Sequence, residues 1–181
     1  MRMLLDACVL YPTVLREILI GVARSGAYRP LWSARILEEW ARAAARLGPV
    51  DEAFARGEIA ALRAEFPAAE VAPQPGLESR LHLPDVNDIH VLAAAIAGHA
   101  DAIVTFNAQD FPRGTLAAEG LERRDPDGLL WALWSENPAQ IGAVVEAVRA
   151  RAEALSGQPQ PLRPLLKRAK LPRLAKAMEA A

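Results

Sequence analysis

The feature that most constrains the fold is the stretch Leu83–Pro112, which combines an acidic helix start, an apolar helix and a short buried strand. Asp85 precedes the first residue of the apolar pattern and Asp88 follows three positions later, which predicts a helix running to about Gly98. Residues 102–106 are a short apolar run with β-branched side chains, typical of a parallel strand buried on both faces. The stretch therefore predicts a helix–strand unit of an α/β fold.

Short apolar segments alternate with helical periodicity along the rest of the chain. Ser33 and Asp51 are the expected N-caps of two of these helices, and residues 156–161 form a Gly/Pro/Gln linker. The alternation predicts a three-layer α/β/α fold with a mostly parallel central sheet. The expected strands are residues 4–5, 70–72, 102–106 and 121–123, and residues 28–32 are expected to be a short extended connection broken by Pro30. The expected helices are residues 12–23, 34–47, 52–65, 85–98, 128–135, 139–155, 162–170 and 172–181.

Charge is unevenly distributed along the 181 residues, whose formal net charge is −1. Residues 157–181 carry six basic side chains against one acidic, whereas the preceding 156 residues carry 15 basic and 21 acidic. An acidic body is not a general binder of phosphate backbones, so a polyanion would have to meet local cations or a metal ion.

The sequence predicts a cytoplasmic protein that is not inserted in a membrane. Cys8 is the only cysteine, which rules out an internal disulfide and suits a reducing compartment. The opening residues MRMLLDACVLYP do not read as a signal peptide, and no apolar run has the length of a membrane span.

Acidic side chains are expected at the ends of several separate elements. Asp6 interrupts the first strand near its carboxyl end, where open α/β sheets build their sites. Asp88 falls about 40° from Leu92 on a helical wheel, so its carboxylate points inward, and burying it unpaired would cost several kcal/mol. Glu39 borders the apolar face of the helix at 34–47, whereas Glu38 faces water.

Simpler roles remain open for the same residues. Asp85 and Asp88 suit a helix N-terminus, a contribution of about 1 kcal/mol, and Asp6 suits a turn. His99 falls on the apolar side of the wheel and is expected in the core.

The chemistry that such acids support is hydrolysis of phosphate esters with a hard divalent cation, which prefers oxygen ligands and activates water without histidine or serine. The residues that other phosphate-binding or phosphate-transferring protein classes require are absent from the expected positions. The three lysines lie at positions 167, 170 and 176, which leaves no P-loop, receiver-domain or haloacid-dehalogenase lysine in the body of the chain. HExxH and GxSxG motifs are also absent, which disfavours zinc hydrolysis and a serine nucleophile.

Three segments together resemble the PIN-domain ribonucleases, and in particular the VapC-type toxins of type II toxin–antitoxin pairs. They are LLDACVLYP, WSARILEEW and PDVNDIHVLAAAIAGHADAIVTFNAQDFP, the last being the most specific. The resemblance covers most of residues 3–124. It implies a PIN-like nuclease domain at residues 1–124, and residues 125–181 resemble a helical extension, here with a basic tail.

The resemblance also implies an Mg²⁺- or Mn²⁺-dependent RNA endonuclease site. Asp6, Glu39 and Asp88 would hold the metal directly or through water. Asn107 stands where many members carry Asp, which makes Asp110 a candidate substitute ligand. Thr105 and Asn107 would orient a ligand or water, and Asp85 would cap the helix or support the ligands.

Partners are expected from the same resemblance and from the tail. The resemblance implies an RNA substrate and an antitoxin, and a homodimer is left open. The tail residues Arg163, Lys167, Arg168 and Lys170 either bind the RNA backbone, dock on the acidic body or form a solvated face. The alternative function is a catalytically inactive PIN-fold scaffold that binds nucleic acid or a partner protein, which Asn107 favours.

Overall fold

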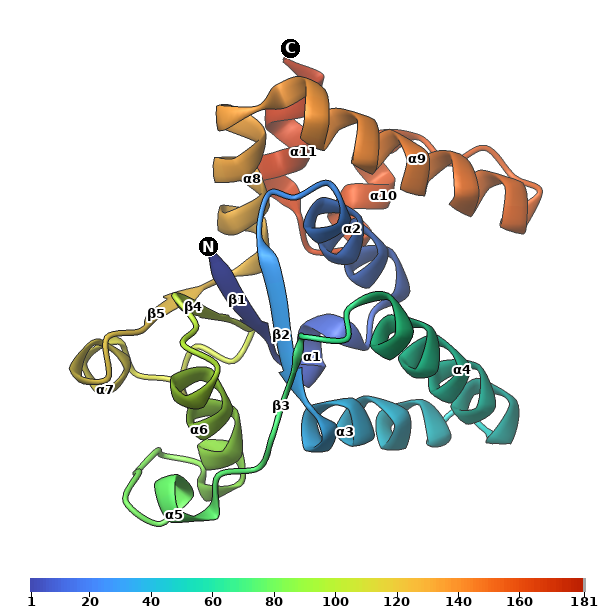
Figure 1. Cartoon of the computed structure of the whole chain (residues 1–181). Helices are drawn as coiled ribbons and strands as arrows, with labels where there is room; N and C mark the ends of the chain where they lie inside the picture. Colours follow the sequence, from blue (N-terminus) through green and yellow to red (C-terminus); the bar gives the residue numbers. More distant parts are fainter. Residues whose placement is uncertain (181) are drawn as a thin grey trace. The chain divides into compact units, whose positions relative to one another are not determined.

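The computed structural model describes residues 1–180, which form two compact units (Figure 1). Unit 1 comprises Met1–Tyr11 and Arg29–Arg123, and unit 2 comprises Pro12–Tyr28 together with the chain from Arg124 onward. The units are groups of mutual contacts, and the division into a nuclease domain at 1–124 and an extension at 125–181 stays a prediction.

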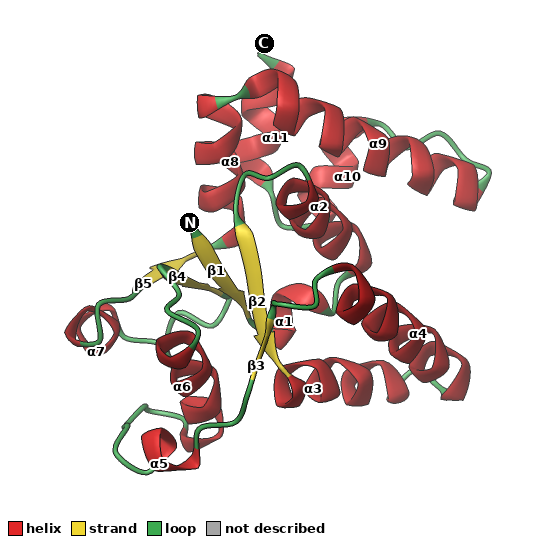
Figure 2. Ribbon diagram, in the orientation of Figure 1, coloured by secondary structure: helices red, strands yellow, loops and turns green. Residues whose placement is uncertain are grey.

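The centre of the fold is a five-stranded sheet in the order β3-β2-β1-β4-β5 (Figure 2). β1 pairs in parallel with β2 and with β4, and β2 pairs in parallel with β3. The register places Leu4 opposite both Leu31 and Ile103, and all three side chains are buried. The expected α/β/α fold with a mostly parallel sheet is therefore confirmed. The strands are β1 Arg2–Leu5, β2 Arg29–Ser33, β3 Glu70–Val71, β4 Ala102–Val104 and β5 Glu122–Arg124.

Two helical elements of unit 1, α3 and η1, begin at a residue whose side chain accepts from a backbone N–H of the first turn. The Ser33 hydroxyl accepts a hydrogen bond from Ile36 N at 3.2 Å and so caps α3, as expected. Asp51 does not cap α4, because that helix begins earlier, behind Gly48, and leaves Asp51 in its first turn. The helical elements of this unit are α1 Ala7–Leu10, α3 Ala34–Ala45, α4 Pro49–Glu65, α5 Pro75–Glu78, the 3-10 turn η1 Val86–Asp88, α6 Ile89–Ala97 and α7 Arg113–Ala118.

The packing of α6 on the sheet depends on its last residues. α6 contacts β2 and β4. A Cβ at Gly98 would lie 2.9 Å from side-chain atoms of both Leu31 and Val71, so only glycine permits this approach. The helix ends there, and His99 adopts a left-handed φ of 50° and is exposed. Its expected place in the core was wrong, because the helical wheel does not extend past Gly98.

Unit 2 is a group of helices with its own apolar core. A Cβ at Gly21 would lie 2.6 Å from Val144 Cγ1, which shows how closely α2 approaches α9. Asp125 and Asn137 cap α8 and α9 by accepting from Gly128 N at 2.8 Å and from Gln140 N at 3.2 Å. The helices of this unit are α2 Thr13–Arg24, α8 Pro126–Glu136, α9 Pro138–Ser156, α10 Leu162–Arg168 and α11 Pro172–Glu179.

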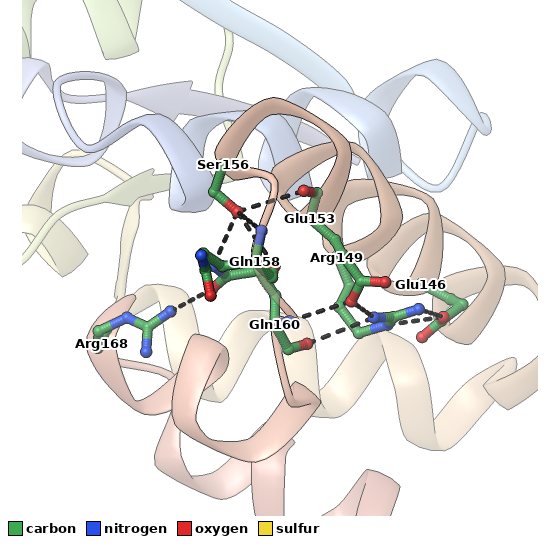
Figure 3. Close-up of polar contacts among 7 residues, drawn as sticks. All are labelled: Glu146, Arg149, Glu153, Ser156, Gln158, Gln160 and Arg168. Carbon is green, nitrogen blue, oxygen red and sulfur yellow. Dashed lines mark hydrogen bonds and ion pairs between the residues drawn. The ribbon is translucent and has the colours of Figure 1, made fainter.

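The expected linker at residues 156–161 is fastened to α9 by polar contacts (Figure 3). Glu153 Oε2 accepts a hydrogen bond from Gln160 N at 3.0 Å and pairs with Arg149 Nη1 at 2.7 Å. Arg168 of α10 donates to the side-chain oxygen of Gln160 at 2.7 Å. The segment that joins α9 to α10 is thus held by side chains on both of its sides. Within residues 1–180, none of the helices combines the length and apolar character that crossing a membrane requires.

Candidate metal centre

The carboxyl ends of the neighbouring strands β1 and β4 bring Asp6 and Thr105 together. Asp6 follows β1 directly, and its N–H donates to Val104 O at 3.2 Å. The Thr105 hydroxyl follows β4 and donates to Asp6 Oδ2 at 2.7 Å. Both side chains are buried, with 8% and 2% of their residue surface exposed. The contact fixes the direction of the Asp6 carboxylate.

Cys8 completes this contact, a role that the sequence did not reveal. Its Sγ donates to Asp6 Oδ2 at 3.1 Å and accepts from Phe106 N at 3.3 Å. Burial, followed by the negative charge of Asp6, raises the pKa of the Cys8 thiol to about 12. Cys8 therefore stays a neutral thiol that ties α1 to the chain after β4.

Three carboxylates gather where η1 faces the loop after β4. Ligand oxygens of Asp85, Asp88 and Asp110 all lie within 4.8 Å of one another. The pKa of Asp88 is raised from its usual value to about 6 by burial first, and then by the charges of Asp6, Asp85, Asp110 and Glu39. Four acids therefore act on Asp88, although Asp6 and Glu39 lie outside the closest three.

Asn107 bridges two of these acids. Its Nδ2 donates to Asp88 Oδ2 at 3.1 Å and, over a very short contact, to Asp110 Oδ2. The backbone N–H of Asn107 donates to the Thr105 hydroxyl at 2.9 Å. An amide group therefore partly offsets the repulsion between the two carboxylates.

Asp85 has the capping role that the sequence allowed. Its Oδ1 caps η1 by accepting from Asn87 N at 2.8 Å and from Asn87 Nδ2 at 3.0 Å. It also belongs to the closest three carboxylates, whereas we had expected it to cap the helix or support the ligands. The N-cap pattern in the sequence explained Asp85 by itself, so it gave no reason to expect its carboxylate beside that of Asp88.

Glu39 lies at the edge of the cluster with two basic neighbours on one oxygen. Its Oε1 is 3.4 Å from Arg35 Nε and 2.9 Å from the Nε2 of His90. His90 is buried, and its ring nitrogens have no hydrogen-bond partner among the described residues. His90 and Glu39 are therefore close to each other but are not joined by a hydrogen bond. The neighbouring Glu38 is instead paired with Arg42 and Arg56 away from the cluster.

The tail residues expected to bind nucleic acid belong to unit 2. Arg163 pairs with Glu179 at 2.7 Å, and Arg168 bonds the neutral Gln160. Lys167 is exposed, and Lys170 takes a left-handed φ of 61° after α10. Arg163, Lys167 and Arg168 lie on α10, whereas Lys170 follows the helix that was expected to contain it.

The comparison with family models agrees with this geometry, since the model of the PIN domain matches residues 2–109. The chain belongs to the PIN-domain family. A comparison with curated proteins and one with solved structures gave no match. PIN domains are generally metal-dependent nucleases, and the matched residues include Asp6, Glu39, Asp85, Asp88 and Asn107, with Asp110 directly after them.

The donor set of this PIN domain fits a hard divalent cation. Carboxylate oxygens are the ligands that Mg²⁺ and Mn²⁺ prefer. Three like charges whose ligand oxygens lie within 4.8 Å of one another repel, and a bound cation would offset that repulsion.

Proposed function

We propose that this PIN-domain protein is an Mg²⁺- or Mn²⁺-dependent endoribonuclease. The observation that carries the proposal is the gathering of four acidic side chains around Asp88, near the carboxyl ends of β1 and β4. Family membership supplies the reaction class, phosphodiester hydrolysis, and the donor set supplies the cofactor class.

The proposed ligands are Asp6, Glu39 and Asp88, with Asp85 and Asp110 beside them. A bound divalent cation supplies positive charge for the phosphodiester in its transition state and makes water more acidic. The protein's own contribution is orientation: Thr105 holds Asp6, and Asn107 holds Asp88 close to Asp110.

The test is cleavage of a labelled single-stranded RNA in Mg²⁺, in Mn²⁺ and in EDTA. Asp6→Asn and Asp88→Asn should abolish cleavage, and EDTA should do the same to the wild type. Glu39→Gln should lower the rate at least tenfold, an effect of about 1.4 kcal/mol. Glu38→Gln is the matched control, because Glu38 neighbours Glu39 on α3 but is paired with Arg42 and Arg56. Undiminished cleavage by both aspartate variants would refute the site.

A second candidate function is a catalytically inactive PIN scaffold, and Asn107 is the observation that favours it. An amide that donates to two acids already satisfies part of the charge that a cation would neutralise. Calorimetric titration with Mn²⁺ separates the candidates, since a nuclease must bind the ion and a scaffold need not.

The biological role that we propose is a cytoplasmic toxin controlled by an antitoxin. An acidic pocket attracts an arginine inserted by a partner, which is one way in which an antitoxin could block the site. Expression of the wild type in a bacterial host should arrest growth, whereas Asp88→Asn should not. Normal growth with active wild-type enzyme present would refute the toxin role and leave the nuclease proposal intact.

We also propose that the cations on and after α10 contact the RNA backbone. Unit 2 carries 11 basic and 7 acidic residues, whereas unit 1 carries 10 basic and 15 acidic. Changing Lys167 and Arg168 to Gln together should lower the slope of log affinity against log salt by about 1.4 for single-stranded RNA. An unchanged slope would leave these residues as a solvated face.

A further inference from the structure

The acidic cluster is carried by two loops, and each loop is tied at its backbone by an arginine from another element. The first loop contains η1 with Asp85 and Asp88, and the second runs from Asn107 to Phe111 and contains Asp110. Loops that hold like charges together need contacts that oppose the repulsion.

Arg123 of β5 ties the second loop. Its Nη1 donates to Ala108 O at 2.5 Å and to Phe111 O at 2.9 Å. These two carbonyls lie on either side of Asp110, so one guanidinium nitrogen fixes the backbone both before and after that acid. The Phe111 ring is fully buried, which anchors the far end of the loop.

Arg35 of α3 ties the first loop. Its Nη2 donates to Asn87 O at 3.3 Å, a carbonyl between Asp85 and Asp88. Its Nε lies 3.4 Å from Glu39 Oε1, on the same oxygen that His90 approaches.

We propose that Arg123 and Arg35 are positioning residues that hold the two acidic loops in the arrangement that binds a divalent cation. The proposal rests on the function proposed above, and it assigns a structural task to two cations that by charge alone would oppose a metal ion. Ligand oxygens of Asp85, Asp88 and Asp110 lie within 4.8 Å of one another, and the arginines must hold the two loops together against the repulsion of these like charges.

Loss of charge and loss of positioning are expected to change the affinity for Mn²⁺ in opposite directions, which makes the proposal testable. Removing a positive charge near an acidic cluster should, by Coulomb attraction alone, tighten the binding of Mn²⁺. Removing a group that orients metal ligands should instead weaken it, typically by 10–100-fold.

The experiment is calorimetric titration with Mn²⁺ of the wild type, Arg123→Gln, Arg35→Gln and Arg113→Gln. We expect a roughly tenfold or larger loss of affinity for Arg123→Gln, and a smaller loss for Arg35→Gln, whose single bond to the loop is longer. Arg113, exposed on α7 just after the second loop, is the control for loss of charge and should show unchanged or slightly tighter binding.

Two further measurements separate positioning from loss of the fold. Thermal unfolding in EDTA should show each variant folded, and Arg123→Lys should recover part of the affinity, because an ammonium can still donate to one of the two carbonyls. If the wild type binds Mn²⁺ and Arg123→Gln binds it equally or more tightly, the role of the arginines is overturned and the nuclease proposal stands. If the wild type binds no Mn²⁺, both are overturned.

Discussion

Asn107 donates a hydrogen bond from its side-chain amide to the carboxylate of Asp88 at 3.1 Å, across two loops that approach each other at the end of the sheet. The same nitrogen donates to Asp110, so the amide is shared by two acids. This residue stands where many PIN-domain ribonucleases are expected to carry Asp. An amide at this position reduces the repulsion between the carboxylates of Asp88 and Asp110 in the absence of a cation, because it donates a hydrogen bond to both of them. A carboxylate at the same position would add to that repulsion.

Asn107→Asp should therefore destabilise the protein without metal and increase its response to metal. The substitution replaces two hydrogen bonds with two repulsions, and we expect a loss of about 1–3 kcal/mol in the free energy of unfolding in EDTA. Saturating Mn²⁺ should recover the loss, because binding stabilises the folded state in proportion to ligand concentration over Kd. Thermal unfolding in both buffers measures this. Asn107→Ala, which adds no charge, should lose stability without gaining in its metal response.

Stability should also depend on the protonation of Asp88. Its pKa is raised from 3.8 to about 6 in the folded state, chiefly by burial, so between these pH values the folded protein binds a proton more tightly than the unfolded chain. The charged carboxylate thus costs stability above pH 6, and the cost disappears as the pH falls toward 4. In EDTA, Asp88→Asn should be more stable than the wild type at pH 7.5, and urea unfolding should show the difference shrinking at pH 5. A constant difference across this range would contradict the assigned pKa.

Thr105 should act on Asp6 through its hydroxyl alone. The hydroxyl donates to Asp6 Oδ2 and accepts from Asn107 N, so it links β1, β4 and the second acidic loop. Thr105→Val keeps the shape of the side chain but leaves a buried carboxylate without this donor, which should cost about 1–3 kcal/mol in denaturant unfolding. Thr105→Ser keeps the hydroxyl and should lose much less. Equal losses in both variants would mean that the methyl group, and not the hydrogen bond, carries the effect.

Much of the fold could be predicted from the sequence because its signals are local. The helix after Ser33 begins where expected, and those after Asp125 and Asn137 begin within two residues of the expected start, since a cap acts over three residues. α4 begins at Pro49, two residues before Asp51. The start was missed because Asp51 itself fits the pattern of an N-cap. The short helices α5 and α7 were not predicted, because four to six residues carry too little periodicity.

The site could be predicted only as a list of acids. Periodicity and strand ends indicated Asp6, Glu39 and Asp88, but the distances among them depend on how two loops fold. Asp85 beside Asp88, the thiol of Cys8 on Asp6 and the bridging amide of Asn107 are contacts between residues 2 to 19 positions apart, and they depend on how irregular segments fold. Sequence spacing carries no signal for such contacts.

Asp127 should be the residue on which the anchoring of α11 depends. It is a buried carboxylate near the start of α8, and it accepts hydrogen bonds from Arg173 N at 2.8 Å and from Leu174 N at 3.0 Å. These N–H groups belong to the first turn of α11, which has no side-chain cap of its own, so Asp127 caps a helix 46 residues further along the chain. Arg173 also lies over the ring of Trp131, 4.2 Å from its centroid, and holds the same helix against α8.

Asp127→Ala removes the acceptors of one buried and one partly buried N–H group and should cost about 1.5–3 kcal/mol. Asp127→Asn retains one acceptor oxygen and should lose less. Hydrogen exchange at residues 172–179 is the measurement, because the amide protection of α11 should fall in Asp127→Ala ahead of that of α8. Glu136→Ala, an exposed change at the end of α8, is the control for a general loss of stability. Full protection of α11 in Asp127→Ala would show that its apolar contacts hold the helix without the cap.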